Sequence, residues 1–528
     1  MKSEFIFVSR SHRAIAFLAV LTALISQGQV ARAEGSWVSP EVKLKGRILF
    51  LGDSITHAGH YVSLIEASLR DAPSETGDDE VELINLGLSS EGCTGLSEPT
   101  HPFPRPNVHE RLDRALSMVK PDLVFACYGM NDGIYHPFSE ERFKAYQDGM
   151  NRLIEKVHTA GLPLVLITPP PFDPEPLRAR GNLRPKGAAK YSWTEIYENY
   201  DTEVLARYAV WVLAQRDRVE GVIDSRTPVL AYVAEKRKSD PAFTLSNDGV
   251  HLNEEGHRVL AGAIAKAFGY DPARYDEILP QHIKDIHDRQ TLLHDAWLTY
   301  VGHLRPQTKI GLPLAFAQAV ASLPDGDLGR RVSLFNGKDL AGWEGDSQYW
   351  SVEDGAIVSR NAGTVPSSTY LFSKKAYRNF RLLFEVKQTV SPEHSTMHSA
   401  VGILGEKMED KGGNAFGFRG PLVMFCHDWG IWDANRRNRI EPAGQKGALR
   451  IPAEKTGDWN LIEIVAIGDR IRGVANGTLV FDFTDQPGML KASPLGLQLH
   501  ANQKPQEYRF RGLVVVEDPD DRLVTLKK

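Results

Sequence analysis

Two patterns of apolar and polar residues alternate through residues 45–270. Short, almost uninterrupted apolar runs predict buried β-strands. Between them, longer stretches repeat apolar residues every three or four positions, which is the spacing of an amphipathic α-helix. This alternation is typical of a parallel sheet covered by helices on both faces, so we expect an α/β domain. The predicted strands are Ile48 to Leu51, Val81 to Leu86, Leu123 to Cys127, Leu164 to Ile167 and Val222 to Asp224, and a further helical segment is expected from about Thr194 to Gln215.

The pattern changes twice after residue 270. Residues 271–330 contain no strand signal and are dominated by helical runs such as Ile283 to Leu298, which predicts a helical extension. Residues 331–528 contain short apolar strands separated by Gly, Asn and Asp, for example at 381–387, 461–465 and 479–483. Short strands with such turns favour an antiparallel β-sandwich.

The N-terminus has the composition of a secretory signal peptide. Basic residues precede an apolar run over residues 14–25, and the small-residue sequence Ala31-Arg32-Ala33 follows it. This order predicts a signal peptide over residues 1–33, and its apolar run is too short to span a bilayer. No cysteine lies near the predicted cleavage site, so we expect no stable membrane anchor. We therefore expect an exported protein, periplasmic or extracellular.

Charge and cysteine usage narrow the range of partners. The chain has 62 basic and 67 acidic residues and a formal net charge of −5, without a basic face or tail. This balance argues against nucleic acid or an anionic membrane as an obligatory partner. Cys93, Cys127 and Cys426 are too few to pair completely. Cys127 lies in an apolar run and is expected as a buried free thiol, although a bridge between Cys93 and Cys127 is an open alternative.

Ser54 stands where the first predicted strand ends and a helix begins. It lies in the sequence Gly52-Asp53-Ser54-Ile55-Thr56. Open α/β folds place their ligands at the carboxyl ends of strands, and the N-terminus of a helix favours negative charge. The position therefore suits a nucleophile.

A serine nucleophile needs a base, an orienting acid and hydrogen-bond donors for the oxyanion. The loop after the second strand offers Gly92, and the loop after the third offers the side-chain amide of Asn131. Asp248 and His251 lie three residues apart, just before a helix that begins near residue 253. Three residues is short enough for the carboxylate to fold back onto the imidazole within one loop.

These motifs in this order resemble the SGNH (GDSL) hydrolase family over about residues 45–270. The resemblance implies a flavodoxin-like parallel sheet and a serine hydrolase with no metal or cofactor. It implies Ser54 as the nucleophile, His251 as the base and Asp248 as the acid that orients the imidazole. It also implies an oxyanion hole built from the backbone NH of Ser54, the backbone NH of Gly92 and the side chain of Asn131.

Neighbouring residues compete for these roles. Gly87 is the alternative to Gly92, which we favour because it lies within the loop rather than at the strand end. Asp53 and Asp132 are expected to cap a helix or brace a loop. His57, His60 and His257 also lie near the motifs, in surface or supporting positions, with a surface ion pair to Glu254 expected for His257.

The last part of the chain carries a second resemblance. Motifs over about residues 331–517 resemble the 3-keto-disaccharide hydrolase domain, which implies a lectin-like jelly roll. The central strands, at residues 397–402 and 422–427, lack the acid of that family. A glycosidase of the usual kind needs two carboxylates, so binding is favoured over cleavage unless Glu385, Asp428 or Asp433 supplies an acid.

Aromatic and histidine side chains are the other candidates in this domain. Trp429 and Trp432 have polar neighbours, so we expect them to be exposed and able to stack on glycan. His394 and His398 lie in a strand-like stretch, and we expect no metal site there.

The sequence therefore predicts an exported serine esterase. Because no long apolar lid is evident, short-chain acyl esters of carbohydrates, acetyl esters first, are the expected substrates, with a glycan-binding C-terminal domain. The alternative is a glycan-binding or 3-keto-glycoside-cleaving protein whose main functional unit is the C-terminal sandwich.

Overall fold

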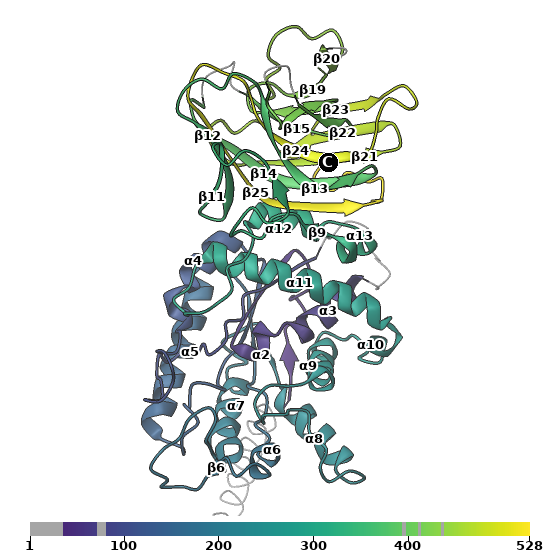
Figure 1. Cartoon of the computed structure of the whole chain (residues 1–528). Helices are drawn as coiled ribbons and strands as arrows, with labels where there is room; N and C mark the ends of the chain where they lie inside the picture. Colours follow the sequence, from purple (N-terminus) through teal and green to yellow (C-terminus); the bar gives the residue numbers. More distant parts are fainter. Residues whose placement is uncertain (1–34, 71–80, 393–397, 410–412, 434–437, 528) are drawn as a thin grey trace, which may run out of the picture. The chain divides into compact units, whose positions relative to one another are not determined.

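A computed structural model describes residues 35–70, 81–392, 398–409, 413–433 and 438–527. The predicted signal peptide, residues 1–33, lies outside these described residues. The chain divides into two compact units, of which the first ends at Gly311 and the second begins at Leu312. Figure 1 labels many of the helices and strands of both units. Within the described ranges, no helix has the length and apolar character required to cross a bilayer.

A six-stranded sheet forms the centre of the first unit, in the order β1-β8-β5-β4-β2-β3. The strands are β1 (Trp37–Val38), β2 (Arg47–Gly52), β3 (Glu82–Asn85), β4 (Leu123–Cys127), β5 (Leu164–Ile167) and β8 (Gly221–Ile223). Strands β2, β3, β4, β5 and β8 pair in parallel, while β1 is antiparallel to β8. The predicted α/β class is confirmed. Strand β1 was not predicted, because two residues are too short to form a periodic pattern.

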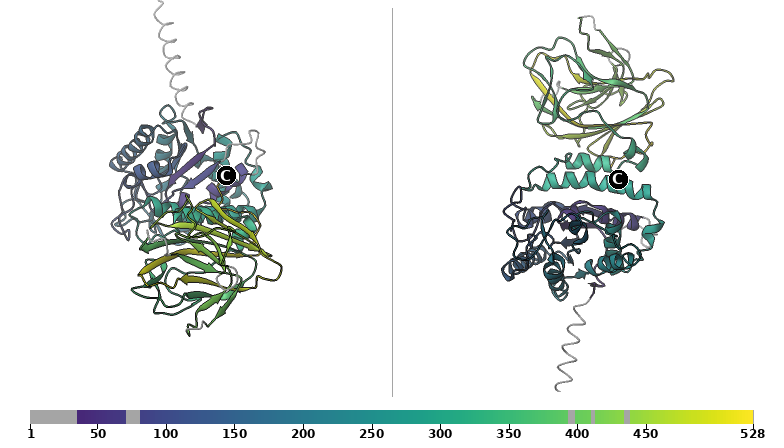
Figure 2. Two further views of the ribbon diagram at one scale, coloured as in Figure 1. Left: turned by 90° about the horizontal axis from the view of Figure 1, so that it is seen from above. Right: turned by 60° about the horizontal axis from the view of Figure 1, so that its bottom comes forward.

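Helices lie on both sides of this sheet (Figure 2). The longer ones are α3 (His60–Arg70), α4 (Leu112–Val119), α5 (Glu140–Thr159), α7 (Ala206–Leu213), α8 (Arg226–Lys236), α9 (Glu254–Ala267) and α11 (Pro280–Val301), and the short ones are α2 (Ser54–His57), η1 (Val108–Glu110), α6 (Glu175–Arg178) and α10 (Arg274–Glu277). Local interactions determine where helix α5 begins. Ser139 caps α5 by accepting from the NH of Arg142, and two glutamates occupy its first turn.

The segment predicted as helix from about residue 194 is partly extended. Residues Ile196–Tyr197 form β7, which pairs in parallel with β6 (Leu183–Arg184). The helix begins later, with the π-helical turn η2 (Tyr200–Leu205) followed by α7. Tertiary pairing overrides the helical pattern here, because the NH of Tyr197 donates to the carbonyl of Tyr135 at 3.1 Å.

The predicted helical extension, residues 271–330, is divided between the two units. Helix α11 belongs to the first unit, where it packs on α3 and β3. Gln290 donates through Nε2 to the carbonyl of Leu83 at 3.0 Å, and His294 donates to the carbonyl of Gly87 at 2.9 Å. Helices α12 (Leu314–Ala321) and α13 (Asp325–Arg330) belong to the second unit.

Two antiparallel sheets form the second unit. The seven-stranded sheet has the order β10-β13-β24-β15-β18-β19-β20 and the eight-stranded sheet β11-β12-β25-β14-β21-β22-β23. Their inward side chains form one apolar core, which confirms the predicted sandwich. The strands are β9 (Val332–Ser333), β10 (Trp343–Glu344), β11 (Trp350–Glu353), β12 (Ala356–Asn361), β13 (Thr369–Tyr377), β14 (Phe380–Val390), β15 (Ser399–Gly402), β16 (Glu406–Met408), β17 (Gly417–Arg419), β18 (Leu422–Phe425), β19 (Gly430–Asp433), β20 (Asn438–Glu441), β21 (Asn460–Ile467), β22 (Arg470–Ala475), β23 (Thr478–Thr484), β24 (Ser493–Leu499) and β25 (Gln506–Glu517).

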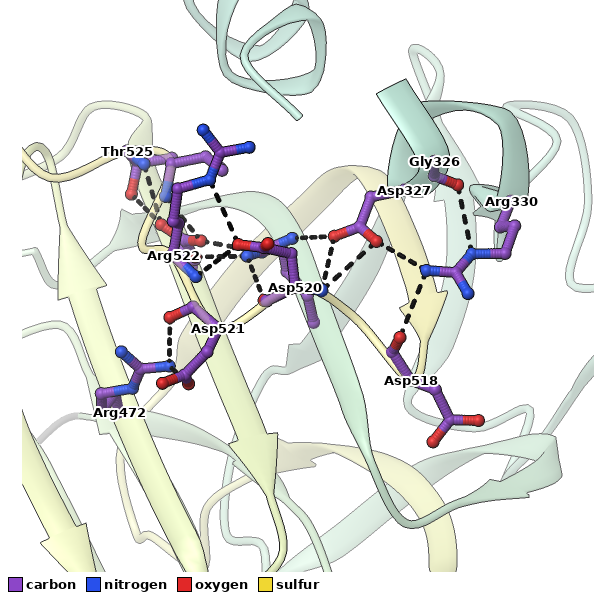
Figure 3. A network of polar contacts seen from close by, with 12 residues as sticks. Gly326, Asp327, Arg330, Arg472, Asp518, Asp520, Asp521, Arg522 and Thr525 are labelled. Atoms are coloured by element: carbon purple, nitrogen blue, oxygen red, sulfur yellow. Dashed lines mark hydrogen bonds and ion pairs between the residues drawn. The ribbon is translucent and has the colours of Figure 1, made fainter. Parts of the chain in front are cut away.

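A buried charge network joins α13 and the end of the chain to the eight-stranded sheet. The guanidinium of Arg381 lies between the carboxylates of Asp327 and Glu463, and the three side chains are at most 3% exposed. Figure 3 shows the carboxylate of Asp327 meeting the backbone NH of Asp520, which donates to it at 3.0 Å. Glu463 accepts from the NH and the hydroxyl of Thr525 at 2.9 and 2.7 Å. Because an unpaired buried charge is very costly, this network fixes the C-terminal segment in place.

Candidate active site

Ser54 lies at the carboxyl end of β2, on the first residue of α2. Asp53 caps this helix, since its Oδ1 accepts from the NH of Ile55 at 3.0 Å. Gly52 is needed for the tight turn: a Cβ there would lie 2.2 Å from Oγ1 of Thr56 and 3.0 Å from the carbonyl of Cys127. The backbone NH of Ser54 makes no hydrogen bond within the described part of the chain, as is usual for the first turn of a helix.

His251 and Asp248 lie on one loop and meet Ser54. Nε2 of His251 lies 2.8 Å from Oγ of Ser54, and its Nδ1 lies 2.7 Å from Oδ2 of Asp248. Oδ1 of Asp248 accepts from the backbone NH groups of Val250 and His251 at 2.9 and 2.8 Å. The side chains of Asp248 and His251 are 48% and 47% exposed, so the site is open to solvent.

Gly249 shapes the turn between Asp248 and His251. Its φ of +79° lies in the left-handed region, and a Cβ would meet the carbonyl of Asp173 at 2.4 Å. The loop is anchored beside this point, because the NH of Asp173 donates to the carbonyl of Gly249 at 2.9 Å. Asn253 then caps α9 by accepting from the NH of Gly256 at 2.9 Å.

Asp248 and His251 each stabilise the charged form of the other. Burial alone would raise the pKa of Asp248, but the hydrogen bonds and charge of His251 hold it well below its usual range. Burial alone would lower the pKa of His251, but the hydrogen bond and charge of Asp248 outweigh it, with a contribution from Asp53, so the pKa is raised. The arrangement therefore stabilises the protonated form of His251.

Asn131 lies in the loop after β4, the neighbour of β2 in the sheet. Its Oδ1 accepts from Nη1 of Arg105 and from the hydroxyl of Tyr135, both at 2.9 Å. These two donors settle which amide atom is the oxygen. Nδ2 donates one hydrogen to the carbonyl of Glu91 at 2.9 Å, and its second hydrogen has no acceptor among the described residues.

The residues that hold Asn131 gave no sequence signal. Arg105 forms a two-point ion pair with Glu98, with 2.7 Å contacts from Nε and Nη2, and both side chains are almost fully buried. Ile134 and Tyr135 have left-handed φ values of 47° and 59°. Such backbone costs on the order of 1–3 kcal/mol per residue and is concentrated at functional sites. Here it brings the Tyr135 hydroxyl to Asn131.

The prediction that Gly92 donates to an oxyanion is wrong for this structure, because its NH donates to the carbonyl of Pro106 at 3.1 Å. A Cβ on Gly92 would lie 2.7 Å from Oδ1 of Asp132, so this glycine is required for packing. The alternative, Gly87, is also engaged, since its NH donates to Oδ1 of Asn85 at 2.8 Å. Ser90 in the same loop has a left-handed φ of 68°, and within the described ranges its NH makes no hydrogen bond.

Buried acids brace this loop, as expected for Asp132. Oδ1 of Asp132 accepts from the NH groups of Cys93 and Thr94 at 2.7 and 3.1 Å. Glu91 forms a fully buried ion pair with Arg111 at 2.7 Å. Burial raises the pKa of Asp53 to about 7 and also raises the pKa of Asp132.

Of the other histidines near the sequence motifs, His57 and His60 contact histidine rings of helix α11. The His60 ring stacks on His287 at 4.1 Å between centroids, and His57 lies 4.5 Å from His294. His257 is 1% exposed, so the predicted surface ion pair with Glu254 is wrong. Within the described residues, no group of three or more His, Cys, Asp or Glu side chains has the arrangement of a metal site.

All three cysteines are free and buried. The alternative of a bridge between Cys93 and Cys127 is therefore not realised. The buried free thiol predicted for Cys127 is confirmed.

The candidate residues of the second unit are less accessible than predicted. Trp429 is 2% exposed and donates through Nε1 to Glu454 at 2.9 Å, so its predicted exposure is wrong. Trp432 is half-buried on β19, beside the guanidinium of Arg439. Asp428 pairs with Arg439, Glu385 lies on the eight-stranded sheet and pairs with Arg511 at 2.7 Å, and Asp433 is buried. His394 lies outside the described residues, and His398 contacts the His500 ring at 4.2 Å.

Family models match both units. The model of the GDSL-like lipase/acylhydrolase family matches residues 50–259, and the model of the 3-keto-alpha-glucoside-1,2-lyase-like domain matches residues 330–515. The two resemblances inferred from sequence are thereby confirmed. The chain has no match among curated proteins.

Several solved structures resemble parts of the chain. A gut microbial diltiazem-metabolizing enzyme is 21% identical, with 45% of this chain and 49% of its own covered and a TM-score of 0.33. A candidate arylesterase from Agrobacterium tumefaciens is 23% identical, with 44% and 99% covered and a TM-score of 0.30. A carbohydrate binding module from Bacillus subtilis is 15% identical, with 33% and 96% covered and a TM-score of 0.25. This chain thus spans about half the length of the first of these proteins.

Proposed function

We propose that the GDSL-like acylhydrolase domain of this chain is a serine esterase that removes short acyl groups, acetyl first, from carbohydrates. The observation that carries the proposal is the pair of hydrogen bonds through His251, 2.8 Å to Ser54 and 2.7 Å to Asp248. They join a nucleophile, a base and an orienting acid in the order that acyl transfer requires.

The reaction follows from this order. His251 takes the Ser54 hydroxyl proton at Nε2 while Oγ attacks the ester carbonyl, and Asp248 stabilises the imidazolium. Collapse of the tetrahedral intermediate breaks the bond to the alcohol oxygen, which receives the proton from Nε2 and leaves. A water molecule then gives its proton to His251 and attacks the acyl-enzyme, which releases the acid and restores Ser54.

We infer three donors for the oxyanion: the NH groups of Ser54 and Ser90 and the side-chain amide of Asn131. Ser90 takes the place predicted for Gly92, since its backbone is left-handed and its NH makes no hydrogen bond to the described part of the chain. Arg105 and Tyr135 hold the Asn131 amide, so that no reorientation is needed when charge develops.

The solvent exposure of the candidate active site supports a carbohydrate ester as the substrate. The half-exposed side chains of Asp248 and His251 allow a bulky polar alcohol to approach the nucleophile. We further propose that residues 1–33 direct export, which gives the enzyme access to polysaccharide, and that the second unit binds glycan through Trp432 and so raises the local substrate concentration.

Glycan cleavage by the second unit is the alternative proposal, favoured by the match to a lyase-like domain over residues 330–515. The ion pairs made by Asp428 and Glu385 count against it, since both carboxylates are already engaged. A Ser54→Ala protein that still cleaves a 3-keto-glucoside would establish this alternative.

The test is hydrolysis of p-nitrophenyl acetate and acetylated xylan by the wild type, Ser54→Ala and His251→Ala. Ser117→Ala and His158→Ala are matched controls, because both residues lie on helices of the same unit and outside the site. Loss of both activities in the two site variants alone supports the proposal. Equal rates in all five proteins would refute it.

A further inference from the structure

Trp193 presents an indole ring to solvent at the tip of a tight hairpin. The side chain is 48% exposed, although tryptophan gains more than most residues from burial. Ser192 and Glu195 exchange two backbone hydrogen bonds of 3.0 Å, which leaves Trp193 and Thr194 as the two-residue turn. The fold therefore displays a ring that it does not use in its core.

The hairpin is attached to the residues that hold the oxyanion donor. The NH of Trp193 donates to Oε1 of Glu98 at 3.3 Å, and the same oxygen accepts from Arg105 at 2.7 Å. Arg105 in turn donates to Oδ1 of Asn131 at 2.9 Å. Since each hydrogen bond spans about 3 Å, the Trp193 backbone lies on the order of 10 Å from the Asn131 amide.

A second set of contacts makes the hairpin rigid. The NH of Tyr197 donates to the carbonyl of Tyr135, within the Asn131 loop, at 3.1 Å. Glu195 pairs with Arg184 and with Lys190, the latter at 2.8 Å. A preorganised aromatic ring costs little entropy when a ligand stacks on it.

We propose that Trp193 is a stacking platform for the sugar ring of the acylated carbohydrate, a subsite beside the ester-cleaving centre. The inference rests on the proposed esterase function and deepens it. The apolar face of a pyranose ring suits an indole, while its hydroxyl groups stay in solvent at this open edge. The platform binds the alcohol part of the ester and therefore contributes to KM for sugar esters.

The test compares a sugar ester with an ester that has no sugar. Trp193→Ala is expected to raise KM for acetylated xylotriose about tenfold, with kcat within about twofold, and Trp193→Phe is expected to restore most of the loss. Hydrolysis of p-nitrophenyl acetate is expected to stay unchanged. Trp37→Ala is the matched control, because Trp37 is 37% exposed on β1, which β8, β5 and β4 separate from β2.

A binding measurement separates this inference from the esterase proposal. Titration of acetylated xylotriose into Ser54→Ala protein, with and without Trp193→Ala, is followed by NMR and needs no turnover. About tenfold weaker binding in the double variant supports the platform even if the wild type proves inactive. Equal affinity in the two proteins overturns it even if the wild type is an esterase.

Discussion

Replacement of Asp248 by asparagine tests the geometry of the site with a change of very few atoms. The asparagine oxygen can still accept from the NH groups of Val250 and His251, which in the wild type lie 2.9 and 2.8 Å from Oδ1. Its NH2 group then faces Nδ1 of His251, where the carboxylate oxygen stood at 2.7 Å. Two donors cannot share that contact, so the imidazole must carry its proton on Nε2 instead. In that tautomer it cannot take the proton of Ser54.

The expected loss is large. An asparagine in the equivalent place of a well-studied serine protease triad lowers kcat on the order of 10⁴-fold, through the same change of tautomer. Because Asp248 and His251 lie on the surface of the unit and the loop keeps its backbone hydrogen bonds, the free energy of unfolding should change little. A loss of activity without a loss of stability is therefore the expected pattern.

The pH dependence adds a second readout. The base acts when it is neutral, so kcat/KM rises with pH through the pKa of His251. In the wild type Asp248 raises that pKa against the effect of burial, which lowers it. Once the carboxylate charge is gone, the pKa falls, and the acid limb of the profile moves to lower pH even as the plateau drops.

The assay is kcat/KM for p-nitrophenyl acetate from pH 5 to 9, with urea unfolding in parallel. Glu254→Gln is the control, since it removes a carboxylate that lies six residues from Asp248 along the chain and makes no hydrogen bond to His251 within the described residues. An Asp248→Asn enzyme with wild-type kcat/KM, or one whose acid limb moves to higher pH, would refute the reasoning.

Three further outcomes are expected. Asn131→Ala should lower kcat for p-nitrophenyl acetate by about 10²–10³-fold with little change in KM, since an oxyanion donor acts in the transition state; a rate within twofold of the wild type would exclude that role. Burial and neighbouring histidines lower the pKa of His257 to about 3, so the folded state binds fewer protons than the unfolded state. This residue should therefore cost about 1.4 kcal/mol of stability per pH unit as pH falls below about 6.5. In urea unfolding at pH 7 and pH 5, the free energy of unfolding of His257→Gln should decline less than that of the wild type. Trp429→Ala should lower the free energy of unfolding by about 3–5 kcal/mol, measured by denaturant titration, whereas an exposed ring would cost far less.

Local sequence explains much of the candidate site. Asp248 and His251 lie on one turn, and the helix after them has the capping residue Asn253, so their proximity could be read from spacing. The position of Ser54 followed from the change between strand and helix periodicity. These inferences needed only neighbours along the chain.

Inferences that depended on distant partners were less successful. Gly92 was predicted to turn freely in its loop, but a glycine is required there because Asp132 packs against it. Trp429 has polar neighbours in sequence, yet Asp428 turns to Arg439 while the ring enters the core. Arg105 lies 26 residues from Asn131 in a segment without periodicity, so nothing in the sequence connects the two.

The position of Asp248 and His251 on one loop has a mechanical consequence. Residues 246–252 carry both Asp248 and His251, and Ser54 stands on a separate element, to which the 2.8 Å hydrogen bond from His251 reaches. Anything that shifts this loop as a body breaks that contact while the bond between imidazole and carboxylate stays closed. A resting or inhibited state would then keep the low-field NMR signal of the proton on Nδ1 and lose only turnover. Persistence of that signal in an inactive enzyme would therefore indicate that residues 246–252 have moved away from Ser54.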